Sequence, residues 1–269
     1  MNKRRSSGIV MRDIDLKLFY YLYAYKVATS NQIVRDIFKN ISHQALYKRL
    51  NKFIHQGYLQ ASYVKEIRGK LIYSLTAKTF QEYVSDNDKT RCQLKSENIW
   101  HDLALLDLGE IFKTLPGLQL YVTENILRSS VELIEFENLK MIQRLHPDAL
   151  LQIKLHGKEF IFAIEYERSL KFHKRYRPFF DKYYSTSEVD AVLLITKDEY
   201  LTKRLMDKER LLFGNSDSKI FYCTLENVQS AKSKLMFTNR KMEKLIIPKL
   251  VASDDVLATA TLSLSVHND

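Results

Sequence analysis

The hydrophobic positions of the N-terminal third follow a helical spacing and then change to a spacing typical of strands. Apolar residues recur every three or four positions in residues 13–24, 31–38 and 43–56, which predicts three helices. Serine or threonine precedes the second and third segments, and a glycine follows the third, as expected of helix caps. Residues 58–67 and 71–75 are rich in β-branched and aromatic side chains and flank a basic turn. They are therefore predicted to form a two-stranded ribbon.

Three helices followed by such a ribbon is the order of a winged helix-turn-helix. In the predicted third helix the apolar residues share one face and the polar residues share the other. Polar side chains of this kind read base edges, and cations beside them hold phosphates, so we expect this face to bind DNA. A winged helix that binds protein, or only supports the fold, is the alternative. The expected DNA-binding residues are His43, Gln44, Tyr47, Lys48 and Asn51 on the helix, with Arg68 and Lys70 at the tip of the ribbon.

The rest of the chain alternates predicted helices and strands, which indicates a mixed α/β sheet. A helix at residues 94–113 carries His101 ahead of an apolar run, from where the imidazole can reach toward a site. A hydrogen-bonded structural role is more common for a single histidine on a packed helix. Strands are predicted at 118–123, 149–155, 160–167, 190–195 and 218–224, with a helix at 198–212, while 131–136 suits either a short strand or a helix.

Three acidic residues are predicted to meet at one end of the hairpin formed by residues 149–155 and 160–167. Side chains alternate along a strand, so Glu165 and Glu167 project to the same side at the end of an apolar run. Asp148 directly precedes the partner strand and would lie beside them. Such crowded carboxylates repel one another, and a hard divalent cation offsets the repulsion. An acidic pair on a solvated sheet face is the simpler alternative.

Cations interleaved with aromatic residues follow Glu167 directly. A solvated charged helix is the usual explanation of such a run. Its position beside a proposed metal centre favours phosphate binding instead, because cations there both hold the backbone and stabilise developing charge. The cations are Arg168, Lys171, Lys174, Arg175 and Arg177, with Lys182 on the next turns.

The composition favours an anionic partner. The 269 residues are 45% hydrophobic and carry a net charge of +10, which indicates nucleic acid first and a membrane surface second. No apolar run is long enough to cross a bilayer, and no signal peptide is visible, so we expect a cytoplasmic protein without membrane insertion. The only cysteines, Cys92 and Cys223, exclude a disulfide framework and a cysteine-rich zinc site.

The frame Pro-Asp148…Glu165-x-Glu167 resembles the PD-(D/E)xK core of restriction endonuclease-like nucleases. That family usually has lysine at the third position, where this chain has Glu167. The resemblance implies that Lys182 or Lys174 takes the place of the missing lysine. It also implies a fold of class α/β (α+β), an N-terminal winged helix-turn-helix followed by a restriction-endonuclease-like mixed-sheet domain. We expect a basic flexible arm at residues 1–11, the winged helix at 12–85, the nuclease-like domain at 92–250 and a loose tail at 251–269.

The wider layout is similar to replication-relaxation proteins, and most to the MobC-type relaxases of mobilisable plasmids. The features that carry this likeness are the winged helix, His101-Asp102-Leu103, Pro-Asp, Glu-x-Glu, the basic segment and Tyr184. The likeness implies a relaxase that nicks double-stranded DNA at a plasmid origin of transfer with Mg²⁺ or Mn²⁺. It further implies an accessory relaxosome protein and a coupling protein as partners.

Residue roles follow from the same hypothesis. The expected metal ligands are Asp148, Glu165 and Glu167. Glu167 can instead take a proton from the attacking group. Further catalytic candidates are Lys182 and His101. Lys174 and Arg175 are expected to contact DNA. Water or a hydroxyl such as that of Tyr184 can be the attacking group. The rival hypotheses are a non-enzymatic DNA-binding regulator of plasmid replication or transcription with an inert nuclease-like domain, and a restriction-type endonuclease that cuts both strands.

Overall fold

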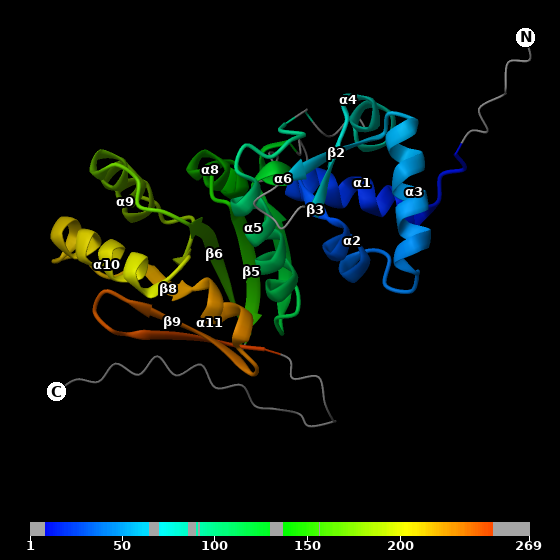
Figure 1. Cartoon of the computed structure of the whole chain (residues 1–269). Helices are drawn as coiled ribbons and strands as arrows, with labels where there is room; N and C mark the ends of the chain where they lie inside the picture. Colours follow the sequence, from blue (N-terminus) through cyan, green and yellow to red (C-terminus); the bar gives the residue numbers. More distant parts are fainter. Residues whose placement is uncertain are drawn as a thin grey trace, which may run out of the picture. The chain divides into compact units, whose positions relative to one another are not determined.

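The computed structural model divides the chain into two compact units, residues 1–106 with 129–131, and residues 107–128 with 132–269 (Figure 1). It describes residues 9–64, 70–85, 90, 92–129, 137–155 and 157–249. The division falls inside the helix α5 (Ile99–Phe112). The predicted segments 65–69 and 131–136, most of the arm at 1–11 and the tail at 251–269 lie outside the described residues.

The first unit contains short helices and a small antiparallel sheet with strand order β1-β3-β2. The three helices and the ribbon that the sequence predicts are present in the expected order. The elements are α1 (Asp13–Tyr25), β1 (Ala28–Thr29), α2 (Ser30–Asp36), α3 (His43–His55), β2 (Leu59–Val64), β3 (Lys70–Leu75), α4 (Ala77–Thr79) and a π-helical segment Phe80–Val84.

Helix α3 is held by its cap, by its apolar face and by one ion pair. The Ser42 hydroxyl accepts a hydrogen bond from the backbone N–H of Ala45, 3.2 Å away, which satisfies one of the free donors of the first turn. Arg49 donates to Asp15 of α1, with 3.1 Å between Nε and Oδ1, and the Asp15 side chain is buried. These contacts fix which side of α3 faces the core. Leu46, Leu50 and Phe53 are fully buried on that side.

The second unit is built on a seven-stranded mixed sheet with order β10-β9-β8-β7-β6-β5-β4. Its elements after α5 are β4 (Leu118–Thr123), α6 (Glu124–Ser129), α8 (Glu137–Leu145), β5 (Ala149–Leu155), β6 (Lys158–Glu167), a 3₁₀ turn His173–Arg175, α9 (Tyr176–Tyr184), β7 (Ala191–Thr196), α10 (Glu199–Phe213), β8 (Ile220–Thr224), α11 (Leu225–Ser230), β9 (Lys234–Asn239) and β10 (Lys244–Pro248).

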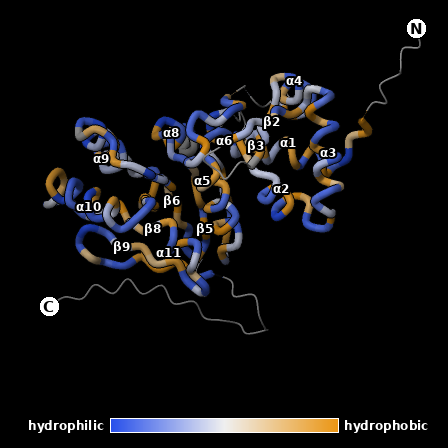
Figure 2. The backbone as a smooth tube through the Cα atoms, viewed as in Figure 1, coloured by the Kyte–Doolittle hydropathy of each residue, from blue (hydrophilic) through white to orange (hydrophobic). Residues whose placement is uncertain are grey.

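The strand directions place β6 at the junction of an antiparallel and a parallel part of the sheet. β4, β5 and β6 pair antiparallel, whereas β6, β7 and β8 pair parallel, with α9 and α10 as the two crossover helices. Side chains of both helices share one buried cluster with β5, β6 and β7, so both helices pack on the same face of the sheet. Figure 2 shows hydrophobic positions along β5, β6 and β8 and many hydrophilic ones on α9 and α10.

A buried charge network joins α9 and α10 to the end of β9. Arg240 donates through Nη1 to Glu209 Oε1 at 3.0 Å, and both side chains are almost completely buried. Tyr222 donates to the other carboxylate oxygen at 2.8 Å, and Tyr184 also donates to Glu209. Arg240 further donates to Tyr184 and to the backbone carbonyl of Phe213. Burial raises the pKa of Glu209, while these donors act in the opposite direction.

Three sequence expectations differ from the structure. The basic segment 168–172 is not helical, and α9 begins only at Tyr176, where side chains enter the core. The helix predicted at 94–113 begins only at Ile99, and Trp100 on its first turn is 37% exposed. The hairpin of β9 and β10 is absent from the sequence prediction. In the described part of the chain, every helix is too short or too polar to cross a membrane.

Candidate functional site: a carboxylate pair beside a basic cavity

The hairpin of β5 and β6 places Asp148 beside Glu165. Ala149 lies opposite Ile164 in the antiparallel register, so the residue before β5 falls next to the residue after Ile164. The Asp148 carboxylate accepts a hydrogen bond from the backbone N–H of Tyr166 at 2.8 Å, and its backbone carbonyl accepts one from the backbone N–H of Glu124 at 2.8 Å. Both the backbone and the side chain of Asp148 are therefore held by neighbouring elements.

Glu165 contacts two consecutive residues of α9. Lys182 Nζ lies 3.1 Å from Glu165 Oε1 and also donates to the carbonyl of Leu145 at 2.7 Å. The Tyr183 hydroxyl donates to the same Oε1. The Glu165 side chain is only 13% exposed, so it keeps little contact with water. Helix α9 thus supplies both of the donors that hold this carboxylate.

The environment of Glu165 makes its negative charge unfavourable. Burial first, and the charge of Asp148 second, raise the pKa of Glu165 to about 7, although Lys182 and Tyr183 act in the opposite direction. A carboxylic acid that titrates near neutral pH beside a second carboxylate is typical of functional sites. The pair Asp148 and Glu165 is therefore the chemically distinctive feature of this sheet end.

Glu167, two residues further along β6, is paired with a lysine of the following segment. Lys171 Nζ lies 2.8 Å from Glu167 Oε2. Burial lowers the pKa of Lys171, but the hydrogen bond and charge of Glu167, with the charges of Glu165 and Asp148, outweigh burial and raise it. Asp148 lies beside Glu165 in the strand register and Glu167 follows two positions later on β6, so all three predicted carboxylates lie at the same end of this strand.

The donor set fits a divalent cation in part. In the portion of the chain that the structure describes, no three His, Cys, Asp or Glu side chains stand together as a ready ligand set. Asp148 and Glu165 offer the hard oxygen atoms that Mg²⁺ and Mn²⁺ prefer, and their mutual repulsion favours a cation. Glu165 and Glu167 are each already paired with a lysine, Lys182 and Lys171. A metal ion would have to compete with these ammonium groups.

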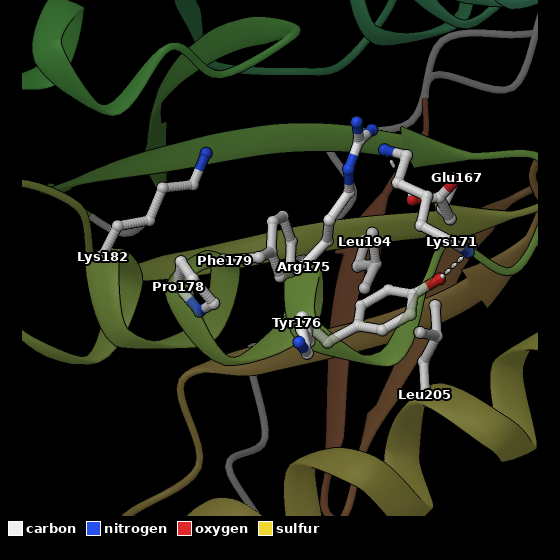
Figure 3. Close-up of a pocket in the computed structure, with 10 residues that line it drawn as sticks. Glu167, Lys171, Arg175, Tyr176, Pro178, Phe179, Lys182, Leu194 and Leu205 are labelled. Atoms are coloured by element: carbon white, nitrogen blue, oxygen red, sulfur yellow. Dashed lines mark hydrogen bonds and ion pairs between the residues drawn. The ribbon is translucent and has the colours of Figure 1, made fainter.

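A cavity of about 420 Å³ adjoins Glu167 (Figure 3). Its wall combines aromatic and aliphatic side chains with cations, and Figure 3 shows the charged ends of Lys171 and Arg175 near Glu167. The predicted residues Lys174, Arg175 and Lys182 all belong to this wall. The lining residues are Glu167, Lys171, Lys174, Arg175, Tyr176, Pro178, Phe179, Lys182, Leu194 and Leu205.

His101 belongs to the first unit, whereas the carboxylates belong to the second. Its Nδ1 lies 3.1 Å from Asp102 Oδ1, and Lys26 Nζ lies 3.3 Å from the same oxygen. Burial raises the pKa of Asp102, but the hydrogen bond from His101 and the charge of Lys26 outweigh burial, so the net pKa is below its usual value. These contacts give His101 a structural role at the start of α5; its catalytic role stays a prediction.

The predicted DNA-binding residues of α3 all lie on its exposed side. Tyr47 is 41% exposed, and its hydroxyl lies 3.2 Å from Ser30 Oγ of α2. Arg68 lies outside the described residues, and of Lys70 only the backbone is described, at the start of β3. The exposed residues of the set are His43, Gln44, Tyr47, Lys48 and Asn51.

Two site residues are not singled out by the sequence pattern. The sequence marks Lys171 only as a member of the charge run, and it suggests Tyr184 as a hydroxyl nucleophile in place of Tyr183. In the structure Tyr184 belongs to the buried network around Arg240, whereas Tyr183 donates a hydrogen bond to Glu165. The sequence signal for Tyr183 is the helical spacing of Tyr176, Phe180 and Tyr183, which marks the face of α9 that enters the core.

No protein-family model, curated protein or solved structure shows a significant match to this chain. The site described above therefore carries the functional argument.

The raised pKa of Glu165 predicts a pH-dependent effect of Glu165→Gln on stability. The folded state holds this proton up to about pH 7, whereas an unfolded glutamate loses it near its ordinary value of 4.5. Wild-type stability therefore falls as pH rises from about 5 to about 8, by about 2 kcal/mol from this group. The neutral glutamine avoids that loss, so the variant should gain on the wild type over this range in urea unfolding without metal. A stability difference that stays constant over the same pH range would contradict the assignment.

Proposed function

We propose that this protein is a metal-dependent, DNA-nicking endonuclease of the relaxase type, which acts at a plasmid origin of transfer. The observation that carries the proposal is the pairing of Asp148 with Glu165 at the end of a mixed sheet, with Lys182 in contact with Glu165. A helix, three antiparallel strands, a crossover helix and a parallel strand surround this pair. This layout supports the restriction-endonuclease-like fold that the Pro-Asp…Glu-x-Glu frame suggests.

In the proposed site Asp148 and Glu165 would hold Mg²⁺ or Mn²⁺ through their carboxylate oxygens. The chemistry that such an ion supplies when bound is Lewis-acid polarisation of the scissile phosphate and activation of an attacking water. Lys182 neutralises part of the charge of Glu165, and its ammonium group would also stabilise the negative charge that develops on the phosphate. Glu167 is the remaining carboxylate and accepts the proton of the attacking group.

The first unit is proposed to locate the DNA as a winged helix-turn-helix. The exposed polar side of α3 carries donors and acceptors for base edges, and Lys48 provides a charge for a backbone phosphate. A relaxase of this type would work in the cytoplasm, with an accessory relaxosome protein and a coupling protein.

The proposal is tested by incubating the purified chain with supercoiled plasmid that carries a candidate origin of transfer, with Mg²⁺, with Mn²⁺ and with EDTA. A metal-dependent conversion to nicked circles is the expected result. Linear plasmid would instead indicate the restriction-type endonuclease, which requires two coordinated cuts. Unchanged supercoiled plasmid under all metal conditions, at protein concentrations that shift the DNA in gels, would reject the enzyme.

The alternative function is a DNA-binding regulator with an inert nuclease-like domain. The observation that favours it is that Lys182 and Lys171 already neutralise Glu165 and Glu167 without a metal ion. A regulator predicts sequence-specific binding that is the same with Mg²⁺ and with EDTA, and that Asp148→Asn and Glu165→Gln leave unchanged.

Both functions predict that α3 contacts the duplex. Lys48→Ala should weaken binding to duplex DNA several-fold at low salt and reduce the salt dependence by about one phosphate contact. Lys17→Ala is the matched control, because it removes the same charge from an exposed position of α1. Fluorescence anisotropy across a salt series measures both quantities. Equal losses for the two variants would show that the effect is only one of total charge.

A further inference from the structure

The cavity beside Glu167 has two chemically different parts. Its floor is formed by buried apolar side chains, with Tyr176 at 4%, Leu194 at 2% and Leu205 at 1% exposure. Phe179 stands at the side, and its ring packs edge to face against Tyr183 at 5.4 Å. The rim carries the cations Lys171, Lys174, Arg175 and Lys182. A site for phosphate alone needs the cations but not this apolar floor.

Part of the rim charge is available to a ligand. Lys171 and Lys182 are engaged by Glu167 and Glu165. By contrast, Lys174 and Arg175 are exposed, and no acidic side chain among the described residues forms an ion pair with either. In Figure 3 the guanidinium of Arg175 extends from the start of α9 toward the side of the cavity where Lys171 and Glu167 lie. An anionic group there would meet the Arg175 guanidinium without displacing an acidic side chain of the described residues.

A second hollow along the start of α9 shares three lining residues with the cavity. The two share Lys174, Tyr176 and Pro178, and the second adds the charged side chains of Arg177, Asp181 and Lys208. Lys208 Nζ lies 4.4 Å from the centre of the Tyr176 ring. Phe172, next to Lys171 in sequence, is 87% exposed, so the segment that precedes α9 also presents an aromatic ring to solvent. Basic side chains with aromatic rings between them are the pattern of single-strand nucleic-acid binding.

We propose that this cavity binds one unstacked nucleotide of a single DNA strand. The base enters against Tyr176 and Phe179, its phosphate is held by Arg175, and the next phosphate lies at Lys174. A volume of about 420 Å³ is within the usual size of small-ligand sites. A base that remains paired and stacked in a duplex cannot reach the apolar floor, because its partner strand cannot enter the cavity with it. This inference rests on the proposed function, since it places the nucleotide next to the carboxylate pair.

The test uses the full chain in EDTA, so that binding is separated from cleavage. The probe is thymidine 5′-monophosphate, which is too small to engage the winged helix, and saturation-transfer NMR reports which of its protons the protein contacts. We expect saturation of the thymine methyl and H6 protons. Arg175→Ala should weaken this binding about tenfold. Lys203→Ala, which removes an exposed cation of α10 that lines neither hollow, should change it less than twofold; melting curves check that both variants fold.

Two further arms separate the sources of the nucleotide. The trinucleotide pTpTpT should bind at least tenfold more tightly than the mononucleotide if the cavity receives a DNA strand, because its flanking phosphates reach Lys174 and Lys208. Equal affinities would indicate a free nucleotide and overturn the strand proposal. If the thymine protons show no saturation and inorganic phosphate displaces the probe, the cavity is a phosphate site only. That result would also overturn the strand proposal. If the protein binds the nucleotide but does not nick DNA, the proposed enzyme is rejected and the nucleotide site stands. If it nicks DNA but does not bind the nucleotide, the nucleotide site is rejected and the proposed enzyme stands.

Discussion

Asp148→Asn and Glu165→Gln are each expected to lower the rate of plasmid nicking by about a thousandfold or more. Each change removes a charged oxygen ligand from the proposed metal site, and a loss of about 4 kcal/mol of transition-state stabilisation corresponds to this factor. Both replacements keep the shape of the side chain. The asparagine that replaces Asp148 retains an oxygen that can accept from the backbone N–H of Tyr166, so the strand pairing should survive. The measurement is the initial rate of conversion of supercoiled to nicked plasmid.

Asp190→Asn is the matched control for Asp148→Asn. Asp190 also accepts a hydrogen bond from a backbone N–H of β6, that of Ile161 at 2.7 Å, but it lies toward the opposite end of the strand. Its replacement should leave nicking unchanged. If both site variants nick at the wild-type rate while they bind DNA normally, the carboxylate pair has no catalytic role and the regulator becomes the better proposal.

Arg240→Met is expected to have the largest effect on stability, about 3–5 kcal/mol. The Arg240 and Glu209 side chains are 1% and 0% exposed, so removal of the arginine leaves a buried carboxylate without its cation. Urea unfolding monitored by near-ultraviolet circular dichroism measures the loss. Lys241→Met is the control, because Lys241 pairs with Asp217 on the surface and its loss should cost less than about 1 kcal/mol.

A double variant distinguishes the lost charge partner from the lost packing. Replacing Glu209 by methionine together with Arg240 removes both buried charges, and part of the lost stability should return. If the double variant is less stable than Arg240→Met alone, the hydrogen bonds from Tyr184 and Tyr222 to Glu209 are the dominant contribution. The ion pair would then not be the reason for the effect.

The helices and strands that the sequence predicts well are those defined by local patterns. Ser42 and Gly57 mark the two ends of helix α3, since a hydroxyl cap and a glycine with positive φ are local requirements. The β5–β6 hairpin follows from apolar runs on both sides of a short polar turn. Its register brings Asp148 to Glu165, so the carboxylate pair could be inferred from the sequence alone.

The remaining features depend on packing that no local pattern records. Residues 168–172 have a composition suited to a helix, but the chain must first leave the sheet end before Tyr176 can enter the core. The β9 strand has alternating burial, but Lys234 and its lysine-rich surroundings resemble a solvated charged segment. The contact of Tyr183 with Glu165 requires the rotation of α9 about its axis, which the neighbouring helix and strands determine.

Three consecutive residues at the end of α9 connect distant parts of the second unit. Lys182 and Tyr183 contact Glu165, while the next residue, Tyr184, is anchored to Arg240, which directly follows β9. Because the three residues are consecutive on one helix, a rotation of α9 about its axis moves all three side chains together. The C-terminal hairpin therefore sets the alignment of the two donors on Glu165, although it contributes no atom to the site. Substitutions in that hairpin would therefore change the pKa of Glu165 under conditions in which the protein is still folded.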